Sequence, residues 1–520
     1  MKTLFINAKV WNGESNFSES IGFDSITGKI TFTGSNYEAN LVKKDYDEIY
    51  DMNKKLVIPS FSDGHCHFIE GSLINSQLDL RNAFTKNDFI NGILEYKSHN
   101  GNNWIYGGFF SDVNFKEEIF PGRNFLDKIC PEVPMIISRF DMHSAFANSK
   151  ALELSGLESR KSDFTSDEIL EINGRLTGEL KERAMDFVLD SMPQPSLKDK
   201  TEIAFRQMKK LHSYGITSIS DITLKADLEV YKELLIGNKF FLKIDARLPF
   251  AEFPSIKKYK DEFREISSDI KFRSFKAFYD GSLSSRTAYM NSNYKGSHQN
   301  GIKTEYVNSG NFEKDVFEID NAGYQMSVHA IGDKAVSELL DLNDALNRIN
   351  GKKDRRFRIE HAQHIAKKDF KRFKELNVIA SVQPGHLFSD AKTSFDMLED
   401  YATAHNYKRV FDYGARICFG TDFPVISENP FETICTAVTR KTRGFENGFM
   451  PELGFTVGEC IESYTSANAY AVYEENERGK LQTGYFADIA VINQDLFEIN
   501  PDEIKFADVH STYFKGNKIY

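Results

Sequence analysis

Short apolar segments alternate with helical patterns through the middle of this chain of 520 residues. The clearest pair is a helical pattern near 201–213 followed by a strand-like segment at 215–221. Six more strand-like segments follow at 241–247, 274–278, 325–329, 357–361, 378–382 and 416–422. With the strand before His65 they make eight, and such alternation is typical of parallel βα units. The pattern predicts a (β/α)8 TIM barrel with its functional site at the carboxyl ends of the strands.

The two ends of the chain differ in character from the middle. Residues 1–60 and 475–520 carry short strands and turn signals, among them a C-terminal hairpin with its turn at Gly516-Asn517. We expect these ends to form one small β-sandwich domain, with the barrel in residues 61–474. Residues from about 75 to 195 do not fit the repeat, and we interpret them as a long insertion after strand one.

Composition and charge narrow the class of protein. The formal net charge of -11 is spread along the chain without a basic stripe, which argues against nucleic acid and anionic membranes as partners. The sequence lacks a run of about 18 apolar residues, the length of a membrane span, and its N-terminal apolar stretch is too short for a signal peptide. The 5 cysteines are scattered without CxxC spacing, which indicates a reducing compartment. The expected location is cytoplasmic.

Two histidines stand two residues apart where an apolar strand runs into a loop. They are His65 and His67, within the segment Val57–Phe68. Residues i and i+2 of an extended backbone point to the same side, so both imidazoles can reach one metal ion while Cys66 points away. Imidazole is the commonest protein ligand for zinc-type metals.

Further candidate ligands fall at the carboxyl ends of other predicted strands. Lys276 lies on strand four, and His329 ends strand five. His361 ends strand six, and Asp422 ends strand eight. Because these strand ends meet at one mouth of a barrel, the sequence predicts a metal site there.

The chain resembles the amidohydrolase superfamily, and within it the amidohydrolase 3 (YtcJ-like) group, over nearly its whole length. Besides the HxH loop, the matching segments are Arg139–Ser144 with Asn148-Ser149, Thr177–Glu182, Asp280–Ala288, His329–Asp333, Gly420–Val425 and Gly484–Ile489. The group includes deacylases and N-substituted formamide deformylases. The resemblance implies a metal-dependent hydrolase that acts on carbon–nitrogen bonds other than peptide bonds, with a small-molecule amide as substrate.

The resemblance also implies roles for the candidate residues. One or two divalent metals, with zinc expected, would be held by His65, His67, Lys276, His329, His361 and Asp422. The metal would activate a water, and Asp422 would act as the general base that takes its proton and passes it to the leaving amine. The alternatives are hydrogen-bonded structural roles for the histidines and a helix N-cap for Asp422.

Lys276 has two interpretations. A lysine on a buried strand is costly unless it is paired, and burial near a metal lowers its pKa. In many members of the superfamily such a lysine adds carbon dioxide, and the resulting carbamate bridges two metals. If Lys276 instead pairs with a carboxylate, a mononuclear site is favoured.

His143 and Arg286 are predicted to bind substrate rather than metal. Arg286 would orient a carboxylate or carbonyl through its planar guanidinium. His143, in the insertion, would close over the pocket. For each residue a structural hydrogen bond is the alternative.

Two other functions compete with amide hydrolysis. The first is a mononuclear deaminase of an aminated heterocycle, because Asp333 follows His329 by four residues. The second is a non-catalytic scaffold, although such relatives typically lose ligands that this chain retains. Related barrels often form dimers, so a homodimer is also an expectation.

Overall fold

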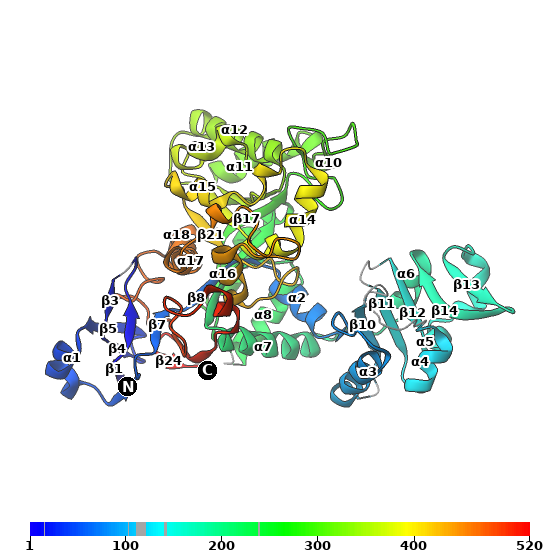
Figure 1. Ribbon diagram of the computed structural model, residues 1–520, viewed down its shortest axis with the longest axis horizontal. Helices are drawn as coiled ribbons and strands as arrows, with labels where there is room; N and C mark the ends of the chain where they lie inside the picture. The colour runs from blue at the N-terminus through cyan, green and yellow to red at the C-terminus, as the bar shows by residue number, and fades with distance from the viewer. Residues whose placement is uncertain (15, 102, 111–120, 140–142, 238–239) are drawn as a thin grey trace. The chain divides into compact units, whose positions relative to one another are not determined.

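A computed structural model describes residues 1–14, 16–101, 103–110, 121–139, 143–237 and 240–520 (Figure 1). It contains two compact units, Glu70–Ile203 and the remainder of the chain, Met1–Ile69 with Ala204–Tyr520. No helix among the described residues is both long and apolar enough to cross a membrane.

Eight parallel strands of the larger unit follow one another around a barrel, which confirms the predicted fold. They are β8 (Phe61–Cys66), β15 (Ile216–Ile222), β16 (Lys243–Pro249), β17 (Ile270–Phe278), β18 (Gln325–Ala330), β19 (Arg358–His361), β20 (Ile379–Val382) and β21 (Ile417–Phe419). At the carboxyl end the backbone joins the first strand to the last: the amide of Asp422 donates to the carbonyl of His65 at 2.7 Å, and that of His67 to Phe423 at 2.8 Å. These bonds place the HxH segment beside Asp422.

Helices lie outside the barrel strands (Figure 1). In α12 the buried residues Val336, Leu339, Leu340 and Leu346 follow the helical spacing i, i+3, i+4 and i+10, which gives the helix one apolar face. The helices of this unit are α1 (Asn36–Val42), α8 (Asp227–Ile236), α9 (Ile256–Arg264), α10 (Glu305–Asn308), α11 (Asn311–Asn321), α12 (Asp333–Ile349), α13 (Phe370–Glu375), α14 (Leu387–Met397), α15 (Tyr407–Asp412), α16 (Pro430–Thr439), α17 (Val457–Tyr464) and α18 (Ser466–Ala471). Two more, α2 (Phe68–Asn75) and α7 (Leu197–Ser213), contain the boundaries between the units.

Strands from both ends of the chain form two sheets, as the sequence predicts. One sheet has the order β5-β4-β1-β6 and the other β24-β23-β22-β7-β2-β3. Their aromatic core includes edge-to-face contacts of Phe5 with Phe23 and Tyr513, at centroid distances of 5.1 and 5.5 Å. The strands are β1 (Lys2–Ile6), β2 (Lys9–Trp11), β3 (Phe17–Ser18), β4 (Ser20–Asp24), β5 (Lys29–Gly34), β6 (Glu48–Asp51), β7 (Leu56–Pro59), β22 (Ile489–Ile492), β23 (Val509–Phe514) and β24 (Asn517–Lys518).

Two details of the sequence prediction are wrong. The apolar residues Leu56–Pro59 form β7, which pairs with β22 in the sheet β24-β23-β22-β7-β2-β3 and is not part of the barrel. The first barrel strand begins only at Phe61. His65 therefore lies within a strand rather than in the loop after it. The C-terminal turn is Lys515-Gly516, one residue earlier than predicted, because these two residues adopt the positive φ angles of 48° and 73° that a tight hairpin turn needs.

The smaller unit is the insertion that follows strand one. Its sheet has the order β13-β14-β12-β11-β10-β9, and its core contains Phe89, Phe110 and Phe146. The elements are β9 (Leu78–Asp79), α3 (Lys86–Asn100), β10 (Ile105–Phe110), α4 (Arg123–Ile129), β11 (Met135–Arg139), β12 (Ser144–Ala147), α5 (Ser149–Ser155), β13 (Ile169–Ile172), β14 (Arg175–Lys181) and α6 (Arg183–Asp190).

Candidate metal centre

Two imidazoles and a carboxylate converge at the carboxyl end of the barrel. The Oδ1 atom of Asp422 lies 3.3 Å from Nε2 of His65 and 3.4 Å from Nε2 of His67. Cys66 turns the other way, with its Sγ 3.9 Å from the carbonyl of Ser220. His361 joins the group, because one ligand atom each from His65, His361 and Asp422 lie within 4.8 Å of one another.

The spacing of these atoms suits a metal ion. Two ligand atoms at the usual zinc distances of 2.0–2.1 Å and at a tetrahedral angle would be about 3.3 Å apart. Burial lowers the pKa of His65 and holds that of His361 well below its usual range, so both imidazoles are neutral and each has a lone pair that could bind a metal. Burial opposes the charge of Asp422, but its hydrogen bonds with His65 and His67 hold the pKa of the carboxyl well below its usual range. Neutral imidazoles with an ionised carboxylate are the donor set of a divalent transition metal.

Two of these residues have a left-handed backbone conformation, which sets the direction of their side chains. His361 has a φ of 69° and Asp422 a φ of 57°. Such conformations cost a non-glycine residue about 1–3 kcal/mol and cluster at functional sites. Consecutive residues of a strand normally face opposite ways. The turn at His361 lets both it and the preceding Glu360 approach His65.

Lys276 lies against the same group. It is 3% exposed, and its Nζ is 3.4 Å from Nε2 of His65. Burial lowers the pKa of its amine to about 8, although the carboxylates of Glu360 and Asp422 oppose that shift. A buried amine with this pKa has a reactive neutral form near neutrality.

His329 stands beside the group but faces partly away. Its ring centroid is 4.5 Å from that of His361. Its Nε2, however, lies 3.2 Å from the carbonyl of Gly281 and 3.6 Å from Oδ1 of Asp280. This contact commits Nε2 to the loop after β17, so only Nδ1 remains for a metal.

The two predicted substrate-binding residues are both exposed. His143 lies in the smaller unit, with its Nδ1 3.2 Å from Oε1 of Glu182. Arg286 lies in the loop after β17 and has a φ of 57°. Their roles in substrate binding stay predictions.

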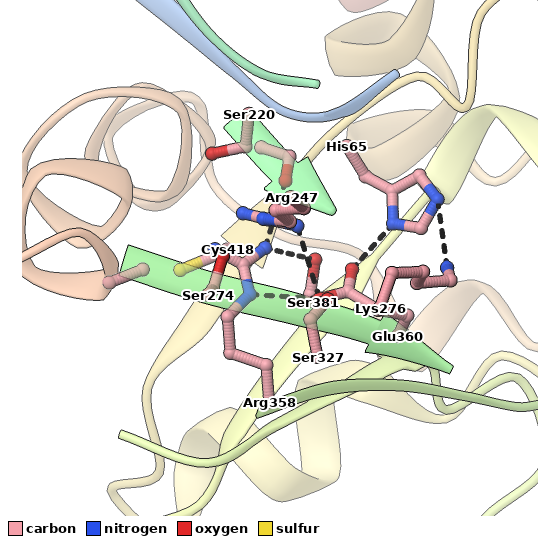
Figure 2. Close-up of polar contacts among 12 residues, drawn as sticks. His65, Ser220, Arg247, Ser274, Lys276, Ser327, Arg358, Glu360, Ser381 and Cys418 are labelled. Carbon is pink, nitrogen blue, oxygen red and sulfur yellow. Dashed lines mark hydrogen bonds and ion pairs between the residues drawn. The ribbon is translucent and has the colours of Figure 1, made fainter. Parts of the chain in front are cut away.

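A buried charged network behind His65 is absent from the sequence prediction (Figure 2). Oε2 of Glu360 lies 2.5 Å from Nδ1 of His65, and its Oε1 accepts hydrogen bonds from Arg247 and Arg358. Burial opposes the charge of Glu360, but Arg358 and Arg247 outweigh it and hold the pKa of the carboxyl well below its usual range. The available signal was the charge itself: Arg247, Arg358 and Glu360 all fall inside predicted strands of a buried barrel.

His386 and Gln383 are two further residues that the sequence reasoning missed. They follow β20, at the same end of the barrel as the other candidate ligands. Nε2 of His386 lies 3.7 Å from Oδ2 of Asp422, and its ring stacks on His361 at a centroid distance of 6.1 Å. Nδ1 of His361 donates to Oε1 of Gln383 at 2.8 Å, which leaves Nε2 as the free ligand atom. Their place directly after a predicted strand could have revealed both.

Asp63 connects the segment of His65 to the segment of Asp422 through hydrogen bonds. Its Oδ1 accepts from the amides of His65 and Thr421, each at 3.0 Å, and its Oδ2 from the hydroxyl of Thr421 at 2.5 Å. Because Thr421 precedes Asp422, one buried carboxylate fixes both sides of the convergence.

Comparison with known proteins gives full-length matches. The sequence model of the Amidohydrolase family matches residues 48–520. Protein LONG AFTER FAR-RED 3 of Arabidopsis thaliana is 28% identical over 99% of this chain and 91% of its own length. The putative amidohydrolase YtcJ of Bacillus subtilis is 26% identical over 95% of this chain and 94% of its own length. The N-substituted formamide deformylase of Arthrobacter pascens is 23% identical over 99% of this chain and 97% of its own length.

A solved structure supports the fold. An uncharacterized metal-dependent hydrolase from Pyrococcus horikoshii superposes with a TM-score of 0.76 at 23% identity, over 96% of this chain and 99% of that one.

Proposed function

The chain belongs to the amidohydrolase family, and from that membership we propose that it hydrolyses the carbon–nitrogen bond of a small-molecule amide with the help of a bound divalent metal. The observation that carries the proposal is the convergence of His65 and His67 on Asp422 at 3.3 and 3.4 Å. Its position at the carboxyl ends of the barrel strands is where enzymes of this fold act.

The proposed ligands are those that the sequence predicts. His65, His67, His329, His361 and Asp422, together with Lys276 as a carbamate, would hold one or two ions. Imidazole and carboxylate donors suit zinc, which is the metal we expect. A divalent ion here would lower the pKa of a water and polarise the carbonyl of the amide.

Asp422 would carry the proton. Its buried carboxylate is ionised and can take a proton from the attacking water as the oxygen bonds to the carbonyl carbon. The same carboxyl group can then give the proton to the departing nitrogen as the C–N bond breaks. His386, 3.7 Å from the other oxygen of Asp422, would help to orient that carboxylate.

The name of one relative suggests the substrate class to try first. The deformylase of Arthrobacter pascens acts on N-substituted formamides by its name, and it aligns with 99% of this chain. We therefore propose an N-formyl or short N-acyl amine as the substrate. Arg286 and His143 remain the candidate substrate contacts.

The deaminase alternative has less support. The Asp333 carboxylate accepts hydrogen bonds from the amide and side chain of Asn291, both at 2.8 Å, and so has a structural use in joining the first residue of α12 to the loop after β17. The buried Lys276 on β17 also departs from deaminase sites, which usually lack a lysine ligand on that strand.

The test is metal content and product release together. Protein purified without chelator should retain about one or two equivalents of divalent metal. It should release a primary amine and a carboxylic acid from a panel of N-formyl and N-acyl amines. Release of ammonia from aminated heterocycles would instead indicate the deaminase. Failure to retain metal after growth and refolding with zinc would favour the scaffold.

A further inference from the structure

We propose that Glu360 is a positioning residue, which fixes the tautomer of His65 so that its Nε2 faces the metal. The inference rests on the proposed function, because it assigns a supporting role at that site. Glu360 is fully buried on β19, and its Oε2 lies 2.5 Å from Nδ1 of His65 (Figure 2). A carboxylate can only accept here, so Nδ1 must carry the hydrogen and Nε2 the lone pair.

Three donors determine how Glu360 is oriented. Its Oε1 accepts from Ser327 Oγ at 2.6 Å, Arg358 Nε at 2.8 Å and Arg247 Nη1 at 3.2 Å. These donors come from strands β18, β19 and β16. One carboxylate oxygen is thus surrounded by donors, and the other is directed at His65.

Both arginines are themselves held in place. Arg247 and Arg358 are completely buried. Nε of Arg247 donates to Asp245 at 3.2 Å. Nη2 of Arg358 donates to the carbonyl of Gly64 at 2.8 Å, directly before His65 in the chain. Fixed partners of this kind orient a ligand more firmly than a surface contact could.

The other side of the His65 ring has two neighbours. Nζ of Lys276, 3.4 Å from Nε2, can only donate as an ammonium and so suits a lone pair there, whereas Oδ1 of Asp422, 3.3 Å from Nε2, would accept an Nε2–H. The contact of Glu360 with Nδ1 is the shorter of the two carboxylate contacts, at 2.5 Å, so we assign the hydrogen to Nδ1.

Glu360→Gln should invert the tautomer without changing the size of the side chain. The three donors would retain the amide oxygen at the Oε1 position, so the amide NH2 would face Nδ1 of His65. Nδ1 would then have to accept, and the hydrogen would move to Nε2, the atom that should bind metal. A change that keeps volume and hydrogen bonding should therefore still weaken metal binding.

The test compares Glu360 with another buried glutamate that is surrounded by cationic side chains. Glu474 is 4% exposed and lies within 3.0–3.5 Å of Lys243, Arg273 and Arg478, and it has no histidine partner among the described residues. We expect E360Q to weaken zinc affinity about 10-fold to 100-fold, measured by competition with a chelator, and E474Q to leave it within about twofold. Equal losses in both variants, or no loss in E360Q, would overturn the proposal.

A second measurement uses metal-free protein and needs no activity. Nitrogen-15 NMR of labelled histidine, with the His65 signals assigned by their loss in His65→Gln, should show the hydrogen on Nδ1 in the wild type and on Nε2 in E360Q. A wild-type hydrogen on Nε2 would overturn the proposal, even if E360Q does not fold. If the wild type binds no metal, the proposed function fails, while the tautomer still decides the role of Glu360.

Discussion

Nζ of Lys276 lies 3.4 Å from Nε2 of His65, and both side chains are buried. Burial lowers the pKa of this amine from its ordinary 10.5 to about 8, so its neutral fraction rises as the pH approaches 8. Only the neutral amine can attack carbon dioxide, forming a C–N bond and releasing a proton to give a carbamate. The buried position of Lys276 thus meets one requirement of the proposed carbamate, a neutral amine near neutral pH.

Lys276→Met should remove one metal ion. Methionine fills similar volume but cannot form a carbamate, so we expect bound metal to fall from about two equivalents to one or fewer. The matched control is Lys243→Met, on neighbouring strand β16, where the buried lysine lies 3.0 Å from Glu474 instead of a histidine. Elemental analysis of both variants checks this. One equivalent in the wild type, unchanged in Lys276→Met, would indicate a mononuclear site.

Asp422→Asn should separate metal binding from proton transfer. The amide oxygen can still act as a ligand, but the side chain can no longer take a proton, so kcat should fall about 10²-fold to 10⁴-fold while metal is largely retained. Asp488→Asn provides a control, because Asp488 is equally buried but pairs with Arg478 at 2.6 Å. A near-normal kcat in Asp422→Asn would exclude the general-base role.

The barrel could be predicted because its signal is repeated. Each strand is a short apolar run between helical patterns, and the carboxyl ends of such strands must meet at one mouth. The side chains of His65, His67, His361 and Asp422 lie close together at that mouth, and their role as metal ligands stays a prediction. Leu56–Pro59 was misassigned because an apolar run has no mark that tells one sheet from another.

The buried hydrogen bonds that surround His65 could not be predicted from the alternation of apolar and polar residues alone. Strand alternation places Glu360 and His361 on opposite faces, and only the left-handed φ of 69° at His361 brings both to His65. That conformation is set by tertiary packing. The partners of Glu360 also lie far apart in the sequence, with Arg247 113 residues away. No local signal joins such residues.

Gly420→Ala should disturb the metal site by steric contact. A Cβ at Gly420 would collide with the backbone nitrogen of His65 and lie 2.9 Å from its Cβ. The backbone at His65 can move aside only at a cost in free energy. We therefore expect a loss of about 1–3 kcal/mol in the free energy of unfolding and weaker metal binding. Gly458→Ala, in helix α17, is the control: of the described residues outside that helix, the nearest atom to its Cβ would be the carbonyl oxygen of Glu14 at 3.5 Å, and helix propensity should make the change neutral or stabilising. Equal metal affinity in both variants would contradict the close approach.

His212 should make the fold sensitive to acid. It is 2% exposed on α7, its Nε2–H donates to the carbonyl of Phe241 at 2.9 Å, and burial lowers its pKa to about 4 from the ordinary 6.5. His212 takes up a proton at higher pH in the unfolded chain than in the folded one. Neutral, buried His212 therefore contributes fully to the free energy of unfolding above pH 6.5, and this contribution is lost as the pH falls toward 4. The difference corresponds to about 3 kcal/mol. Between pH 7 and pH 4.5, urea unfolding of His212→Gln should therefore lose about 2–3 kcal/mol less than the wild type. Equal losses in the two proteins would show that His212 does not carry this acid sensitivity.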